Sequence, residues 1–495
     1  MASQPYRLNR RAALRLFAGA AAGVVGYAGV DDLEVSGASP FPFDPPGELA
    51  NSKRKVFAHW HFFPISFDNR HASNDYFSRE FLGASGSDKQ PRAFGPYASE
   101  RPLPRSPRAG SAWLVDDLEQ DIRWAEAIGI DAFIFNVINI DARSDFWLLL
   151  PKALAAAGRV GGAFRIIPNL DASILKNQDV DEVAAALISV GNHPMWFKAR
   201  SGELVLGAFM AESWPVEKWR RLFAALSQAD MRVQFLPTFL NVREMSKDHI
   251  ELGATISEWG GDYLAAVPAV QMLAAYVKAF GKRWCAPVWP QDVRPKEGVF
   301  TEAANSRLFR ADWQSAIDSD ADDVQIITWN DYSEGSEIRP STGIQYSFYD
   351  LAAFYIAWFK TVRQPRIIRD VLYYFHRVEP FHGRRNSDRQ KNDFTLVGGG
   401  RKADEIELLA FLTKPGELEI ELNGKITRTR APDGVSALYA PLALGRPTFR
   451  LMRDNQIVLE FSSAFVISAP GDYQDLLYRG GSSARAIARQ TSGQN

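Results

Sequence analysis

Short apolar strand segments alternate with amphipathic helical segments eight times over roughly residues 53–365. The predicted strands are Val56–His59, Asp131–Val137, Phe164–Leu170, Val205–Met210, Gln234–Phe239, Thr255–Glu258, Cys285–Trp289 and Val324–Trp329. The predicted helices include 114–128, 180–190, 217–227, 268–280 and 308–317, and a last helix, 349–360, follows the eighth strand. Eight such units are typical of a closed (β/α)8 TIM barrel, with an open doubly wound sheet as the alternative. No glycine-rich phosphate-binding sequence follows the first strand, which favours the barrel.

The rest of the chain indicates an export leader and a second, all-β domain. Arg10 and Arg11 precede an apolar run of small residues, which indicates a twin-arginine (Tat) signal, with an ordinary secretory signal as the alternative. Six short segments separated by turn sequences predict a β-sandwich: Glu405–Phe411, Glu417–Leu422, Lys425–Arg430, Ala437–Pro441, Thr448–Arg453 and Gln456–Phe461. The predicted division is 1–30 signal, 31–52 linker, 53–365 barrel, 366–471 β-sandwich and 472–495 polar, loosely packed tail.

Charge and cysteine content exclude several classes of partner. The chain has 57 basic and 58 acidic residues, so it lacks the basic excess of a nucleic-acid-binding protein. The leader predicts a periplasmic or extracellular location, with membrane association only if the signal stays uncleaved. We also expect a monomer that acts on a polysaccharide or oligosaccharide. Cys285 is the single cysteine, and no His, Cys and carboxylate spacing supports a metal site. We therefore expect no internal disulfide, no metal and no other cofactor.

The segment that closes the eighth predicted strand, Ile326–Glu337, joins an apolar run to an amide, two aromatic residues and three carboxylates. Asp331 and Glu334 are three positions apart, so on a regular strand their side chains would face opposite ways. They can reach one cleft only if the strand ends near Asp331 and the chain turns, which Ser333 and Gly335 permit. Two carboxyl groups acting on one bond are the minimum equipment for glycoside hydrolysis.

Polar and aromatic residues also close the other predicted strands, and in a barrel all these ends meet at one mouth. We predict that the following residues bind substrate there: His59, His61, Asn136, Asp141, Asp171, Glu212, Glu258, Trp289, Trp329 and Tyr332. Carboxylates, amides and imidazoles would bind hydroxyl groups, and an indole would stack on a sugar ring. The alternatives are structural: hydrogen-bonded barrel histidines, carboxylates that cap helices or form salt bridges, and core tryptophans.

Other catalytic classes lack their sequence signatures. The chain has neither a Gly-x-Ser-x-Gly elbow nor a Walker phosphate loop, and Cys285 lies within a predicted strand rather than at the start of a helix. Acid–base chemistry by paired carboxylates is therefore the interpretation that remains.

The strand-eight segment also carries a resemblance to a known family. Thr328–Glu334 resembles the Trp-Asn-Asp-Tyr-Gly-Glu segment of glycoside hydrolase family 71, the endo-1,3-α-glucanases or mutanases. Val56–His59 resembles that family's first strand. Asp121, Gly129–Phe133 and Asn136 resemble its first helix and second strand, and the long first loop is similar to bacterial members.

This resemblance implies an inverting hydrolase that cuts α-1,3-glucan internally, with Glu334 as the general acid and Asp331 as the general base. Ser333 stands where the fungal pattern has Gly, and Gly335–Glu337 departs from it as well. The segment also resembles the Trp-Asn-Glu-Trp-x-Glu-Gly-Thr motif of family 99, which makes an endo-α-mannosidase or mannanase an alternative. A non-catalytic glycan-binding protein on the same barrel and a transglycosylase are further alternatives.

Overall fold

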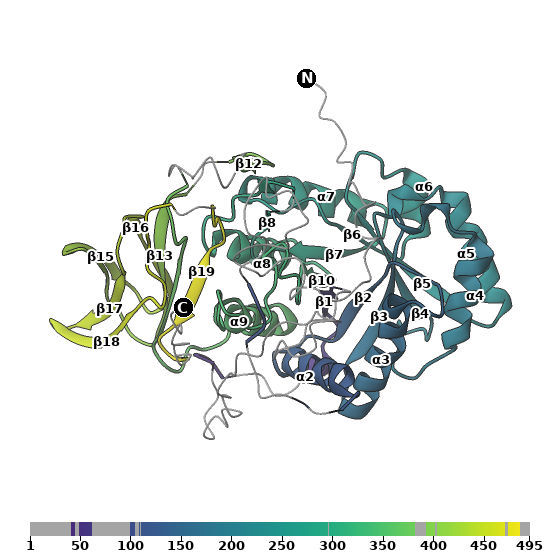
Figure 1. The fold of residues 1–495 in the computed structure, drawn as a ribbon, viewed down its shortest axis with the longest axis horizontal. Helices are drawn as coiled ribbons and strands as arrows, with labels where there is room; N and C mark the ends of the chain where they lie inside the picture. The colour runs from purple at the N-terminus through teal and green to yellow at the C-terminus, as the bar shows by residue number, and fades with distance from the viewer. Residues whose placement is uncertain are drawn as a thin grey trace, which may run out of the picture.

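The computed structural model describes residues 41–44, 49–61, 100–103, 108, 110–295, 297–381, 393–400, 403–470 and 474–485. The predicted signal and most of the long loop after the first strand lie outside these residues. Figure 1 shows the two predicted domains side by side, with helix α9 (Ser347–Thr361) on the side of the barrel that faces the smaller domain. Among the described residues, no helix is long and apolar enough to cross a membrane.

Eight parallel strands close into the predicted barrel. They are β1 (Lys55–Trp60), β2 (Ala132–Val137), β3 (Arg165–Asp171), β4 (Leu204–Phe209), β5 (Val233–Phe239), β6 (Thr255–Glu258), β7 (Arg283–Val288) and β10 (Asp323–Ile326). Pairing of β1 with β10 closes the ring, so the open-sheet alternative is wrong. The barrel is surrounded by α2 (Trp113–Ala127), α3 (Asp145–Val160), α4 (Val180–Val190), α5 (Val216–Gln228), α6 (Lys247–Leu252), α7 (Val267–Ala279), α8 (Arg307–Asp318) and α9.

The eighth barrel strand ends at Ile326, three residues before the predicted end at Trp329. The backbone of Thr328 accounts for this, because it pairs with its own loop instead of a neighbouring strand. Thr328 donates to the carbonyl of Ser336 at 2.7 Å and accepts from the amide of Ile338 at 3.1 Å. The residues between Thr328 and Ser336 therefore form a hairpin-like loop above the barrel, which we call the catalytic loop.

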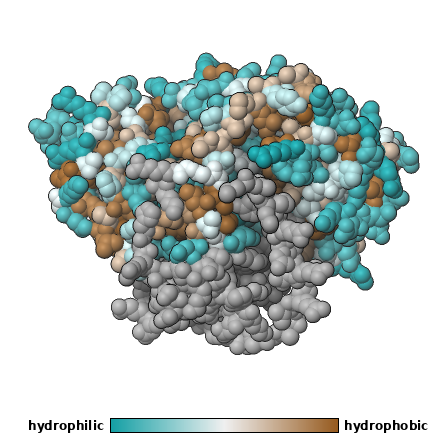
Figure 2. Space-filling model, turned by 90° about the horizontal axis from the view of Figure 1, so that it is seen from above, coloured by the Kyte–Doolittle hydropathy of each residue, from teal (hydrophilic) through white to brown (hydrophobic). Residues whose placement is uncertain are grey.

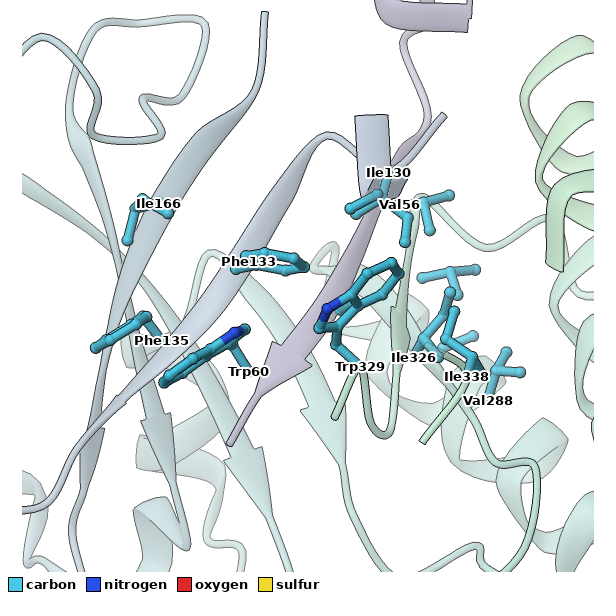
Figure 3. Packing of buried hydrophobic residues seen from close by; sticks show 14 of the residues in the cluster. Val56, Trp60, Ile130, Phe133, Phe135, Ile166, Val288, Ile326, Trp329 and Ile338 are labelled. Carbon is cyan, nitrogen blue, oxygen red and sulfur yellow. The ribbon is translucent and has the colours of Figure 1, made fainter. Parts of the chain in front are cut away.

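Side chains along the barrel strands alternate between the barrel interior and the helix layer. The interior cluster is small and includes Phe57, Ile134 and Cys285. The helix layer is much larger, and Figure 3 shows Trp60 stacked on Phe135 within it. The register of each strand therefore decides which of its last residues point into the mouth.

The C-terminal domain is the predicted sandwich of two antiparallel sheets. One sheet has the order β16 (Gly434–Pro441), β13 (Glu405–Leu412), β11 (Val371–His376) and β19 (Arg479–Ser482). The other has the order β15 (Lys425–Ala431), β14 (Gly416–Leu422), β17 (Thr448–Arg453) and β18 (Gln456–Ser462). All six predicted strands are confirmed, and β11 and β19 are additional. Seen from above in Figure 2, the far end of the barrel is mainly hydrophilic, whereas hydrophobic residues are mixed with hydrophilic ones over this domain.

Two predicted segments outside the domains are better packed than expected. Strand β19 pairs with β11, and Leu476, Leu477 and Tyr478 before it are buried, so the prediction of a loosely packed tail is wrong there. These side chains fill the space between the sandwich and the barrel, which the sequence pattern of the tail did not reveal. In the predicted linker, Phe43 is buried and its ring lies 5.6 Å from that of Phe354 on α9.

A buried ion pair joins the two domains. The guanidinium of Arg377, directly after β11, contacts the carboxylate of Glu302 on the barrel side at 3.2 Å, and both side chains are buried. The hydroxyl of Tyr478 donates to the same carboxylate at 2.6 Å. Buried charged groups are tolerated when they are paired and hydrogen-bonded. These contacts therefore fix the position of the sandwich against the barrel.

Candidate active site

Strand register places several predicted residues at the barrel mouth. Phe57 lies in the interior cluster and Ala58 in the helix layer, so His59 points back into the barrel. By the same alternation Asn136 follows the interior residue Ile134, and its carbonyl oxygen accepts from the Asn169 side chain at 2.5 Å. These polar groups form the upper layer of the barrel interior, directly beneath the catalytic loop.

Burial lowers the pKa of His59 to about 3, and the Asn136 side chain opposes this shift only in part. The imidazole is therefore neutral at physiological pH. Neither ring nitrogen has a well-formed hydrogen bond among the described residues. A buried polar group of this kind at a barrel mouth is suited to a ligand that supplies hydrogen bonds.

Asp331 is held on the catalytic loop by three donors. Its Oδ1 accepts from the amide of Ser333 at 3.0 Å and from the Ser333 hydroxyl at 2.5 Å. Its Oδ2 lies 3.1 Å from Nε2 of His61, which follows β1. Burial lowers the pKa of His61, partly opposed by Asp331, so the neutral imidazole acts as a hydrogen-bond donor. The bonds orient an acceptor carboxylate, the form that a general base needs.

Glu334 lies on the same loop in a different electrostatic environment. Its Oε1 is 3.6 Å from Nε of Arg294, and its side chain is 28% exposed. Burial raises the pKa of Glu334 well above the usual range; Arg294 opposes this shift, while Asp331, Asp292 and Glu297 add to it. A carboxyl group that keeps its proton to higher pH is suited to the role of general acid.

Arg294 and two aspartates complete this side of the mouth, and none of them was among the predicted site residues. Asp292 accepts two bonds from Arg294, at 2.9 and 2.5 Å. Burial and the neighbouring Asp292 raise the pKa of Asp262 well above its usual range, and the two carboxyl groups are hydrogen-bonded. Asp262 and Asp292 follow β6 and β7, so their position after strand ends was a usable signal, whereas Arg294 lies in an insertion.

Aromatic rings line the mouth beside His59. The ring of Trp259 lies 4.7 Å from that of His59, 4.7 Å from that of Phe209 and 5.5 Å from that of Trp289. Trp289 is fully buried in the described structure, so its indole is a wall of the mouth rather than an exposed platform.

Two predicted binding residues of the strand-eight segment lie in the core instead. The earlier strand end turns Trp329 into the helix layer, where it is fully buried with its ring 5.4 Å from that of Phe133, as Figure 3 shows. The hydroxyl of Tyr332 is also buried and accepts from Arg339 at 2.8 Å, and Arg339 is paired with Asp121. Both residues support the catalytic loop from behind.

Three other predicted residues have bonds within the protein. Asp171 closes β3 and accepts from Ser173 and from the Ile174 amide. Glu212 accepts from two backbone amides of the loop after β5 through one oxygen, and burial raises its pKa. Asp141 is exposed, pairs with Arg143 and lines a groove of about 490 Å³ beside α3 and α4, away from the catalytic loop.

Glu258 faces the helix layer rather than the mouth. Ile256 belongs to the helix layer, so alternation turns Glu258 the same way, and a Cβ added to Gly261 would meet both Glu258 and Val270 of α7. One carboxylate oxygen accepts from the Gly260 amide at 2.8 Å, and the other has no described partner. Burial raises the pKa of Glu258 to about 7.

The Glu258→Gln variant is therefore expected to change the pH dependence of stability. The folded carboxyl keeps its proton up to about pH 7, whereas the unfolded one loses it near 4.5, so the wild type loses stability as pH rises across this range. The uncharged amide does not titrate. The melting temperature of the variant relative to the wild type should be higher at pH 8 than at pH 4, and an unchanged difference would contradict this.

Within the described residues, no group of three His, Cys, Asp or Glu side chains could hold a metal ion. The mouth instead brings together a hydrogen-bonded acceptor carboxylate, a carboxyl group with a raised pKa, and neutral polar groups. The charge of Asp331 adds to the raised pKa of Glu334 on the same loop. This combination can donate and accept protons at a bound hydroxyl or ether oxygen.

Comparisons with known proteins agree with this chemistry. The family model described as glycosyl hydrolase family 71 matches residues 109–473. The chain is 24% identical to a mutanase of Penicillium rubens, over 70% of this chain and 80% of that protein. It is 21% identical to a glucan endo-1,3-alpha-glucosidase of Schizosaccharomyces pombe, over 74% of this chain and 91% of that one. Among solved structures, a family 99 endo-alpha-mannosidase from Bacteroides thetaiotaomicron is 14% identical. The match covers 62% of this chain and 98% of that one, with a TM-score of 0.47.

Proposed function

The chain belongs to glycosyl hydrolase family 71 and is an O-glycoside hydrolase, and we propose that it cuts α-1,3-glucan internally with inversion. The observation that carries this proposal is the difference between the two carboxyl groups of the catalytic loop. Asp331 accepts hydrogen bonds from His61 and Ser333, whereas the surroundings of Glu334 raise its pKa. Two carboxyl groups with separated roles are what acid–base cleavage of a glycosidic bond requires.

In the proposed reaction the glucan chain lies across the barrel mouth. Glu334 gives its proton to the departing glycosidic oxygen while the bond from that oxygen to the anomeric carbon breaks. Asp331 takes a proton from a water molecule, whose oxygen forms the new bond on the opposite face of the ring. The product is a hydroxyl of inverted configuration, and the two carboxyl groups exchange protons with solvent before the next cycle.

Neutral residues around the pair would hold the sugar. His59 and Asn136 offer hydrogen-bonding groups from the barrel floor, and His61 fixes Asp331 from the side. Trp259, which packs on the buried Trp289, supplies an apolar wall against which a sugar face can pack. We also propose export through the predicted twin-arginine leader, because a polymer of this size does not cross a membrane.

A polysaccharide panel tests the proposal. Purified protein is incubated with α-1,3-glucan, α-mannan and dextran, and released reducing ends and product lengths are measured, with the Glu334→Gln variant as the control. We expect oligosaccharides from α-1,3-glucan alone. Release from α-mannan would favour the family 99 alternative, binding without release would favour a glycan-binding protein, and products longer than the substrate would indicate transglycosylation.

A further inference from the structure

A short insertion after β7 is anchored to the catalytic loop by its backbone. The amide of Val293, at the start of β8 (Val293–Arg294), donates to the carbonyl of Glu334 at 2.8 Å. Strand β8 pairs with β9 (Val299–Phe300), which in turn pairs with β12 (Thr395–Leu396). The position of Arg294 relative to Glu334 is therefore set by backbone bonds rather than by the two side chains alone.

The guanidinium of Arg294 is shared unequally between two carboxylates. Asp292 is 1% exposed and binds it through both oxygens, at 2.9 and 2.5 Å. Glu334 lies at 3.6 Å, within ion-pair range but beyond a normal hydrogen bond. A guanidinium held by two parallel hydrogen bonds has little freedom to rotate. Asp292 therefore keeps the Arg294 cation beside Glu334 although Arg294 and Glu334 are not directly hydrogen-bonded.

We propose that Arg294 is a positioning residue for the general acid, and that Asp292 tethers it so that Glu334 is oriented toward the mouth yet keeps its proton. This inference deepens the proposed function and rests on it for the role of Glu334. An untethered Arg294 would pair directly with Glu334 and favour the ionised carboxylate, which cannot donate a proton.

The charges that face Glu334 support this arrangement. Among the largest charge effects on the pKa of Glu334, the cation Arg294 lowers it, while the anions Asp331, Asp292 and Glu297 raise it. Asp292, which is hydrogen-bonded to Asp262, raises the pKa of Glu334 and so opposes the effect of the cation. Removing the cation and removing its tether should therefore have opposite effects on Glu334.

The test follows the titration of Glu334 in two variants, Arg294→Gln and Asp292→Asn. Its first readout is thermal stability relative to the same protein carrying Glu334→Gln. Because the folded pKa is raised, this difference should fall as pH rises above about 4.5 and level off above the folded pKa. The pH at which the difference levels off should be higher in Arg294→Gln and lower in Asp292→Asn, each by about one pH unit.

The second readout is the alkaline limb of the pH profile of kcat/KM, which should shift in the same two directions. Arg294→Lys keeps the charge but loses the two-bond tether, so it should lower kcat about 10-fold with little change in KM. Arg453→Gln is the matched control, because Arg453 is held by both oxygens of Asp370 at 2.5 and 3.0 Å in the sandwich, and it should shift neither readout.

Shifts in the same direction, or none, would overturn the role of Arg294. Because the stability readout needs no turnover, the two proposals fail separately. Opposite shifts in a protein that releases no reducing ends would uphold the tether and reject the proposed function. Normal hydrolysis in variants whose Glu334 titration is unchanged would uphold the proposed function and reject the tether.

Discussion

The Glu334→Gln variant is expected to lower kcat on α-1,3-glucan by roughly 10²–10⁴-fold, the usual size of one general acid–base contribution. Gln has the shape of the protonated acid but no proton to give to the leaving oxygen. Since the raised pKa shows that the folded protein favours the uncharged form, the amide should not disturb the fold. Initial rates of reducing-end release, measured beside the melting temperature at pH 5, check both parts.

Asp331→Asn should lower kcat by a similar factor, because an amide cannot take the proton from water. Ser333→Gly is the matched control on the same loop: it removes the hydroxyl donor to Asp331 but leaves the amide donor in place. Ser333→Gly should lower kcat by less than about 10-fold. A Glu334→Gln or Asp331→Asn enzyme with near wild-type turnover would remove that residue from the proposed mechanism.

Arg377→Met is expected to lower the free energy of unfolding by about 3–5 kcal/mol, because it leaves the buried Glu302 carboxylate without its cation. The same change also removes the bond from Arg377 to the Leu476 carbonyl, at 2.9 Å. Chemical denaturation followed by intrinsic tryptophan fluorescence measures the loss. One unfolding transition in the wild type that splits into two in the Arg377→Met variant would show that the interface couples the unfolding of the two domains.

Arg143→Met is the control for this prediction, because its partner Asp141 is exposed and surface pairs contribute little to stability. It should unfold like the wild type. An Arg377→Met protein as stable as the Arg143→Met protein would show that the buried pair is dispensable for holding the domains together.

Periodicity predicted the barrel because most of its strands are short apolar segments, such as β2 and β4, and most of its helices have one apolar face. Of the two additional sandwich strands, β11 has the strand-forming sequence Val-Leu-Tyr-Tyr-Phe-His, which the prediction missed, whereas β19 has a weak signal. Strand β19 has the sequence Arg-Gly-Gly-Ser, which has low strand propensity, and it forms because β11 offers an unpaired edge. Tertiary pairing of this kind cannot be recognised from the segment itself.

The site was predicted in part. Alternation along a strand places His59 and Asn136 in the mouth, and the same rule could have placed Glu258 in the helix layer, since Ile256 two positions earlier is apolar. Trp329 was wrongly placed in the mouth because the strand ends earlier than its apolar run suggests. Arg294 escaped prediction because its position depends on a backbone contact between an insertion and the catalytic loop.

The most direct measurement of the central claim is the configuration of the first product, followed by NMR in the opening minutes of α-1,3-glucan hydrolysis. If Glu334 protonates the leaving oxygen while Asp331 directs water to the opposite face, β-configured reducing ends must appear first and convert slowly to the equilibrium mixture. Reducing ends that appear first in the α configuration would contradict this division of roles, and no release of reducing ends would contradict the assigned polymer.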